Sequence, residues 1–132
     1  MPAKEPSFGM SLETILVVDD APLNLKLTDI VLRKEGYKVV TARDAEEALS
    51  LLESVHPDLM VIDIQLPGMD GLELARRLRQ NAATRDMVLV ALTACAMKGD
   101  DEKAFAAGCD GYLAKPFSLQ QVLDTVHDFL PL

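Results

Sequence analysis

The sequence has little of what several classes of protein need. Its 132 residues include no Trp, two Cys and 5% aromatic side chains. Cys95 and Cys109 give neither a disulfide framework nor a metal-ligand spacing, so we expect reduced thiols. No run of 18 apolar residues predicts a membrane span, and no charged-then-apolar leader predicts a signal peptide. The sequence therefore predicts a cytoplasmic protein with no membrane partner.

Positive charge is also scarce. The chain has 13 Lys and Arg residues against 21 Asp and Glu residues, which gives a net charge of −8. Binding to a nucleic-acid backbone depends on neutralising phosphates with Lys and Arg. No basic stripe along the sequence offsets the acidic balance, so we expect no nucleic-acid partner.

The length and the overall composition are typical of one globular domain. The chain is 49% hydrophobic and 26% charged, and 132 residues are enough for one well-formed core. Residues 1–12 contain two prolines and no apolar periodicity, so they are expected to form a flexible N-terminal tail. The folded domain is expected to comprise residues 13–132.

Short apolar runs alternate with helix-period segments along this domain. The runs at 14–18, 38–42, 59–63, 87–92 and 111–114 predict five strands. The run at 59–63 has no polar alternation, which is typical of a central strand buried on both faces. Strict alternation with five helical segments predicts an α/β fold with a doubly wound, five-stranded parallel sheet.

The helical segments carry recognisable ends. Pro22 suits the first turn of the first helix, whose apolar face is predicted to be Leu23, Leu27, Ile30 and Val31. Gly36 and Gly108 are predicted to end helices as left-handed residues. Three of the remaining helices are predicted to begin at the capping pairs Asp44 with Glu47, Asp70 with Glu73, and Ser118 with Gln121. The helix that ends at Gly108 is predicted to begin within 98–102, where acidic residues in the first turn suit the helix dipole.

Polar side chains follow four of the predicted strands. Asp19 and Asp20 follow the first strand, Asp63 ends the third, Thr93 follows the fourth and Lys115 follows the fifth. The carboxyl ends of parallel strands meet at one edge of the sheet, which is where α/β sheets bind ligands. We therefore expect these side chains to form one site.

Three carboxylates at one edge repel one another unless a cation lies among them. Oxygen ligands select Mg²⁺, Mn²⁺ or Ca²⁺, and a sparse set that leaves room for water and phosphate suits Mg²⁺ best, with Mn²⁺ as an alternative. Asp63 could then attack phosphorus as a nucleophile. Lys115 could pair with phosphate oxygens, and the Thr93 hydroxyl could donate a hydrogen bond to one.

These motifs resemble the receiver domain of two-component response regulators over residues 13–130. The resemblance rests on Val-Val-Asp-Asp at 17–20, Asp-Ile-Gln-Leu-Pro at 63–67 with Asp-Gly at 70–71, Thr-Ala at 93–94 and Lys-Pro-Phe at 115–117. More narrowly, the stretches 63–67, 93–100 and 108–109 are similar to DivK-type receivers and to receivers of hybrid histidine kinases. The resemblance implies a CheY-like, flavodoxin-like sheet with strand order 2-1-3-4-5.

The resemblance also implies a role for individual residues. Asp63 would be the phosphoacceptor. The Mg²⁺ ligands would be Asp19, Asp20, Asp63 and the main-chain carbonyl of Gln65.

Three further positions match switch residues of the family. Thr93 would be the switch hydroxyl, Lys115 would pair with the phosphoryl group, and Tyr112 would be the aromatic switch residue. The family usually holds the peptide bond before Pro116 in the cis form, which few X-Pro bonds adopt.

The function implied is a single-domain response regulator rather than an enzyme. It would take a phosphoryl group from a sensor histidine kinase or a histidine phosphotransferase, and would bind a target protein through the helix near Lys98, the strand 111–114 and the last helix. A receiver module of a hybrid kinase or phosphorelay protein is the alternative with the same chemistry. A small Asp-nucleophile phosphatase fits worse, because Gln65 replaces the usual second Asp and 132 residues leave little room for a lid.

Overall fold

The computed structural model describes residues 13–93, 100–114 and 118–130, with the side chains of 100 and 101 excepted. The strands are β1 (Thr14–Val18), β2 (Lys38–Ala42), β3 (Leu59–Asp63), β4 (Val88–Thr93) and β5 (Gly111–Ala114). The helices are α1 (Pro22–Lys34), α2 (Ala45–Leu51), α3 (Gly71–Gln80), α4 (Asp100–Ala106) and α5 (Leu119–Phe129). The predicted tail, 1–12, lies outside the described residues.

The strands form one parallel sheet in the order β2-β1-β3-β4-β5. This confirms the predicted fold class and strand order. Val18 of β1 pairs with Ala42 of β2 on one side and with Ile62 of β3 on the other. Asp63 pairs with Leu92 of β4, and Thr93 pairs with Ala114 of β5. The carboxyl ends of the strands therefore meet at one edge.

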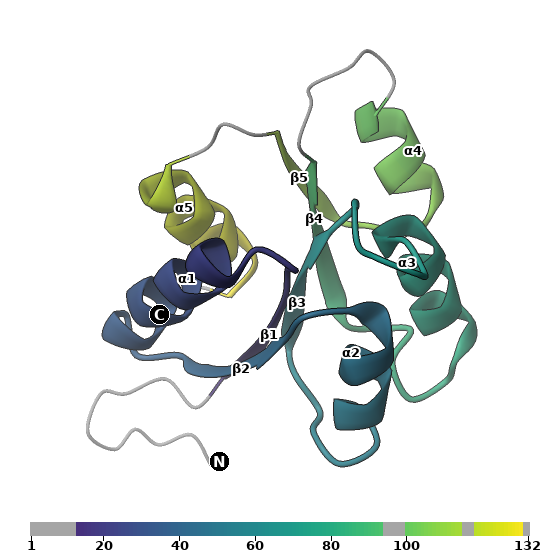
Figure 1. The fold of residues 1–132 in the computed structure, drawn as a ribbon, viewed down its shortest axis with the longest axis horizontal. Helices are drawn as coiled ribbons and strands as arrows, with labels where there is room; N and C mark the ends of the chain where they lie inside the picture. The colour runs from purple at the N-terminus through teal and green to yellow at the C-terminus, as the bar shows by residue number, and fades with distance from the viewer. Residues whose placement is uncertain (1–12, 94–99, 115–117, 131–132) are drawn as a thin grey trace.

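Two layers of helices cover the sheet. Helices α1 and α5 lie on one face, and α2, α3 and α4 lie on the other (Figure 1). Successive residues of each strand supply the two cores: Ile15 and Val17 pack toward α1 and α5, whereas Leu16 and Val18 pack toward the other three helices. Because β3 is buried at every position, it lacks the polar alternation of a half-exposed strand.

The predicted apolar face of α1 is wrong. Leu23, Leu27 and Ile30 are exposed by 68%, 38% and 44%, and Val31 is only partly buried. Leu32 is fully buried instead, with Thr28 also buried and Leu25 packed against the same core. Helix α1 carries apolar residues on two opposite sides, so periodicity alone could not decide which side faces the sheet.

The structure confirms the predicted helix ends. Gly36 and Gly108 have φ values of 101° and 106°, a left-handed conformation that glycine adopts without a Cβ penalty. The side chains of Asp44 and Asp70 each accept a hydrogen bond from the main-chain N–H three residues on, at 2.8 Å. Ser118 and Gln121 form a complete, reciprocal capping box at the start of α5.

Arg79 joins three separate parts of the chain on the α3 side of the sheet. Its Nε donates to the carbonyl of Gly108 at 2.7 Å, and its Nη2 donates to Asp110 Oδ2 at 2.7 Å. Its Nη1 donates to the carbonyls of Arg85 and Met87 at the approach to β4. The same Asp110 oxygen accepts the N–H of Leu89 at 2.9 Å. Arg79 therefore fastens the C-terminal end of α4 to α3 and β4.

Replacing Arg79 by Met is expected to lower the free energy of unfolding by about 2–3 kcal/mol, because hydrogen bonds from a charged donor are among the stronger ones. Its side chain is 21% exposed, so water replaces little of what is lost. Urea unfolding measures the change. Arg76→Met is the control, since Arg76 is 52% exposed and contacts Glu73 at 3.4 Å, a surface pair of about 0–1 kcal/mol. Equal costs for the two variants would contradict the role given to Arg79.

Candidate functional site

The three predicted carboxylates come together at the carboxyl edge of the sheet. Asp63 is the last residue of β3, and Asp19 and Asp20 directly follow β1, its neighbour in the sheet. One oxygen of each lies within 4.8 Å of the others. Asp19 and Asp63 are only 2% and 3% exposed, whereas Asp20 is exposed. Buried carboxylates packed this closely demand a compensating positive charge.

The same local turn orients two of these side chains. Asp19 Oδ1 accepts a hydrogen bond from the N–H of Ala21 at 2.9 Å, and Asp63 Oδ1 accepts one from the N–H of Gln65 at 2.9 Å. An Asp that accepts from the main chain two residues on forms an Asx turn, which suits the point where a strand becomes a loop. The turn holds each carboxylate at the edge of the sheet rather than letting it extend into solvent.

Thr93 belongs to the same edge. It ends β4, the neighbour of β3, and the N–H of Ile64 donates to the carbonyl of Leu92 at 2.8 Å. This places Thr93 next to the end of β3, where its side chain is 3% exposed. The structure thus brings Thr93 to the same edge of the sheet as Asp63, as the sequence predicted.

Tyr112 lies on β5, where it pairs with Ala91 of β4. Its ring is partly buried and packs against the core beneath α2, α3 and α4. Lys115 and Pro116 lie outside the described residues, as does Cys95. The predicted roles of Lys115 and Pro116 therefore stay predictions.

The donor set fits Mg²⁺. Mg²⁺ takes oxygen ligands at about 2.0–2.1 Å, so two oxygens on opposite sides of the ion lie about 4 Å apart. The oxygens of Asp19, Asp20 and Asp63 lie within 4.8 Å of one another, which needs only a small contraction. The exposed Asp20 leaves the solvent side open for water and phosphate oxygens, both of which Mg²⁺ commonly retains.

Gly71, the first residue of α3, packs against the main chain at the end of β3. Its N–H donates to the carbonyl of Ile64 at 2.8 Å, so the loop after β3 folds back on itself. A Cβ at this position would lie 2.4 Å from the carbonyl oxygen of Asp63 and 2.8 Å from Cα of Ile64. Both contacts are with main-chain atoms, so a side chain here would displace Asp63 itself.

Gly71→Ala is accordingly expected to cost at least about 1–3 kcal/mol in the free energy of unfolding, the usual range for overpacking. Urea unfolding measures this cost. Gly68→Ala is the matched control: Gly68 has a φ of 75°, and no atom lies within 4 Å of the place that an added Cβ would take. Only its left-handed conformation is then penalised, by about 1–2 kcal/mol. A Gly71 variant that is as stable as the natural chain would contradict this close approach.

Two other titratable side chains, Cys109 and Tyr37, lie buried away from the carboxylates. Burial raises the pKa of the Cys109 thiol to about 11, so it stays protonated at neutral pH and packs as a small apolar residue. Burial also raises the pKa of Tyr37 to about 12, helped by Glu13 and Glu35. The Tyr37 hydroxyl donates to the carbonyl of Leu130 at 2.6 Å, which ties the end of α5 to the start of β2.

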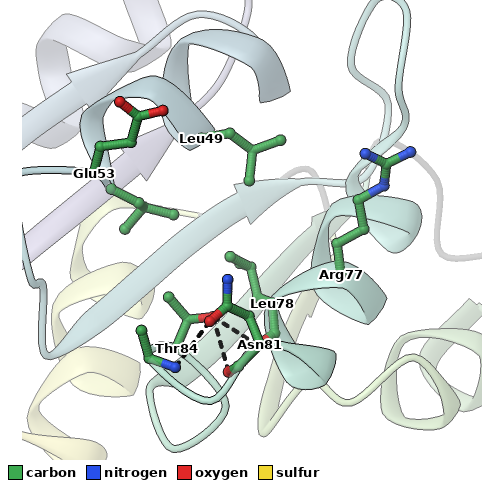
Figure 2. A pocket seen from close by; sticks show the side chains of 8 residues that line it. Leu49, Glu53, Arg77, Leu78, Asn81 and Thr84 are labelled. Atoms are coloured by element: carbon green, nitrogen blue, oxygen red, sulfur yellow. Dashed lines mark hydrogen bonds between the residues drawn. The ribbon is translucent and has the colours of Figure 1, made fainter.

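A pocket of about 430 Å³ lies between α2 and α3 (Figure 2). Its lining includes Leu49 from α2 and Leu52 directly after it, Leu78 from α3, and Asn81 and Thr84 from the loop before β4. Thr84 closes one wall by donating to the carbonyl of Leu78 at 2.7 Å. The pocket lies at the C-terminal ends of α2 and α3. Each of these helices follows a parallel strand and runs back from the carboxyl edge of the sheet. The pocket is therefore at the opposite edge of the sheet from the carboxylates.

The geometry agrees with comparisons to known proteins. Residues 15–127 match the family model described as the response regulator receiver domain. The chain belongs to this family. Receiver domains are phosphoacceptor switches rather than classical enzymes, and they bind Mg²⁺ in an acidic site such as this Asp cluster. They interact with histidine kinases or phosphotransfer proteins and with downstream targets.

Two individual proteins illustrate this similarity. It is 37% identical over 118 residues to the polar-differentiation response regulator DivK of Brucella ovis, covering 89% of this chain and 96% of that protein. The receiver domain of the sensor histidine kinase PA1611 from Pseudomonas aeruginosa, solved with magnesium in its active-site cleft, has a TM-score of 0.82 and 32% identity. That comparison covers 92% of this chain and 100% of the other.

The chemotaxis regulator CheY4 of Vibrio cholerae shares the fold, with a TM-score of 0.85 and 27% identity over 90% of this chain and 99% of the other. In the part of this receiver that the structure describes, no helix is both long enough and apolar enough to cross a membrane.

Proposed function

We propose that this receiver accepts a phosphoryl group from a partner phosphohistidine onto Asp63, in a Mg²⁺-dependent reaction, and signals through protein contacts. The observation that carries the proposal is the cluster of Asp19, Asp20 and Asp63, with oxygens within 4.8 Å of one another at the carboxyl edge of the sheet. Response regulators typically act in the cytoplasm, and we place this one there.

Asp63 supplies the nucleophile in this scheme. One of its carboxylate oxygens attacks the phosphorus, an O–P bond forms, and the P–N bond to the donor imidazole breaks with its electron pair leaving on nitrogen. The hydrogen bond from the N–H of Gln65 to Oδ1 orients the carboxylate for attack, since it restrains rotation of the side chain. A bound Mg²⁺ would neutralise charge on the phosphoryl oxygens.

Five groups would hold that ion and the phosphoryl group. Asp19 and Asp20 would share the metal with Asp63, and the main-chain carbonyl of Gln65 would be a further ligand. Lys115 would pair with the phosphoryl group. These assignments rest on the positions of the motifs and on the observed cluster.

Thr93 and Tyr112 would convert phosphorylation into a signal. A phosphoryl group on Asp63 would accept a charge-assisted hydrogen bond from the Thr93 hydroxyl, which lies buried at the end of β4. Movement of Thr93 would let the partly buried Tyr112 ring change position. The target protein would contact α4, β5 and α5, where Phe105 is 50% exposed and offers an apolar contact.

The same chemistry would serve a receiver within a hybrid histidine kinase. The similarity to the receiver of a sensor kinase from Pseudomonas aeruginosa supports this second assignment. The two differ in which proteins are attached or bound, not in the reaction at Asp63.

Phosphoramidate tests the proposal, because its P–N bond resembles that of phosphohistidine. With Mg²⁺, this receiver is expected to gain one phosphoryl group per chain, read by intact-protein mass spectrometry. A phosphatase would instead turn over a phosphomonoester such as p-nitrophenyl phosphate many times. Sustained turnover without a labelled chain would refute the proposal and favour the hydrolase.

A further inference from the structure

The pocket between α2 and α3 has an apolar wall that the helices leave incompletely covered. Leu49 and Leu52 are three residues apart, so they lie on the same side of the chain at the end of α2. Both are only partly buried, whereas Leu78 of α3, which lines the same pocket, is buried. The volume of about 430 Å³ falls in the range of about 300–1,000 Å³ that is usual for ligand pockets. The pocket therefore has room for one aromatic ring packed on leucines.

Polar groups at the base of the pocket suit a peptide main chain. Asn81 Oδ1 accepts the N–H of Ala83 at 2.9 Å, which holds the Asn81 side chain in one orientation. Its amide nitrogen points into the space between the two helices, where it can donate to a carbonyl (Figure 2). Thr84 Oγ1 donates to the carbonyl of Leu78 and keeps lone pairs that can accept an N–H. A donor and an acceptor beside an apolar wall match an extended peptide with an apolar side chain.

The N-terminal segment joins the sheet at the same edge as this pocket. Strand β1 lies between β2 and β3, and α2, which connects these two strands, contacts β1 and β2. Helix α2 runs back from the carboxyl edge, so its C-terminal end lies over the start of β1. The N–H of Thr14 donates to Asp58 Oδ2 at 2.9 Å, which binds the start of β1 to the loop after α2. The chain before Glu13 therefore emerges beside the end of α2.

The segment before Glu13 contains one aromatic side chain, Phe8. Phe8 precedes Glu13 by five residues, which extend up to about 17 Å, farther than the diameter of a helix at about 10–12 Å. Residues 1–12 include one Lys and one Glu, so the segment is neutral and is not repelled by an acidic chain. Its lack of apolar periodicity is no obstacle, because insertion of a single ring needs no helix or strand.

We propose that the N-terminal segment folds back over the end of α2 and inserts the Phe8 ring between α2 and α3. The ring packs on the three leucines of the pocket, and main-chain groups beside it bond to Asn81 and Thr84. Burial of an aromatic ring, which removes about 150–250 Å² from water, is the main favourable contribution to the contact. The contact lies at the opposite edge of the sheet from Asp63, so it keeps the segment away from the carboxylate cluster.

Tethering favours this occupant over a second copy of the chain. Among the described residues, the exposed aromatic ring is that of Phe105 on α4, at 50%. A second copy that inserted Phe105 would join two different surfaces, and such heterologous contacts build rings or open filaments rather than closed dimers. A segment joined by a short linker instead acts at an effective concentration on the order of mM.

NMR spectroscopy of the full chain tests the proposal. Nuclear Overhauser effects are expected between the ring protons of Phe8 and the methyl groups of Leu49, Leu52 and Leu78. Phe8→Ala should abolish these effects and shift the leucine methyl resonances, because the ring current is lost. Phe105→Ala is the matched control: this exposed ring lies on α4, outside the pocket lining, so its loss should leave the same resonances in place.

A mixture of isotope-labelled and unlabelled chains identifies the occupant. Nuclear Overhauser effects from Phe8 that arise within one chain support the proposal. Effects between chains overturn it in favour of a second copy. Leucine methyl resonances that are identical in the natural chain and in Phe8→Ala, with no effect from the Phe8 ring, overturn it as well.

Discussion

Replacement of Asp63 by Asn should leave no detectable phosphorylated protein after treatment with phosphoramidate and Mg²⁺. The amide has nearly the shape of the carboxylate, and its oxygen can still accept the N–H of Gln65, so the loop after β3 is retained. What is lost is the anionic oxygen that attacks phosphorus. Intact-protein mass spectrometry measures the effect directly.

Asp128→Asn is the control for this experiment. Asp128 is exposed near the C-terminal end of α5, a helix that runs back from the carboxyl edge of the sheet, so it lies away from the carboxylate cluster. The control variant should label as fully as the natural protein. Substantial labelling of the Asp63 variant would mean that another residue is the acceptor, and the assignment of the site would have to change.

Loss of the Asp20 carboxylate should weaken Mg²⁺ binding strongly. Two unit charges 4 Å apart interact by about 4 kcal/mol at an effective dielectric constant of 20. Hydration of the exposed Asp20 offsets part of this, so Asp20→Ala is expected to lower Mg²⁺ affinity by about tenfold or more, since about 1.4 kcal/mol is one factor of ten. Because Asp20 is exposed, the substitution leaves the core intact.

Thr93→Ala is the variant to compare with Asp20→Ala. Thr93 lies beside Asp63 but offers no carboxylate, so this variant should keep nearly the Mg²⁺ affinity of the natural chain and lose only the response to phosphorylation. The chain has no Trp to report binding, so calorimetry or NMR is the suitable measurement. Equal loss of affinity in both variants would contradict the separation between metal ligands and switch residue.

The sheet could be predicted from the sequence because its strands are short, apolar and separated by clear helix ends. Four strands have the predicted bounds, and β4 begins and ends one residue later than predicted. The strand order came from the family resemblance, and the structure confirms it. Convergence of Asp19, Asp20 and Asp63 followed from parallel strands sharing one edge, and the geometry agrees.

Other features depend on tertiary contacts that no local pattern contains. Helix α1 has leucines on both sides, and only packing against the sheet shows that Leu32 is buried while Leu23 is exposed. The Arg79 side chain reaches Asp110, 31 residues away, although an Arg on an amphipathic helix ordinarily predicts an exposed position.

The most direct test of the central claim is to locate the phosphoryl group chemically. Borohydride reduces an acyl phosphate on Asp to homoserine, which marks the acceptor permanently for peptide sequencing by mass spectrometry. After labelling with phosphoramidate and Mg²⁺, homoserine is expected at position 63 and nowhere else. Homoserine at Asp19, Asp20 or another position, or a stable phosphoryl group that borohydride does not reduce, would contradict the assignment of Asp63 as phosphoacceptor.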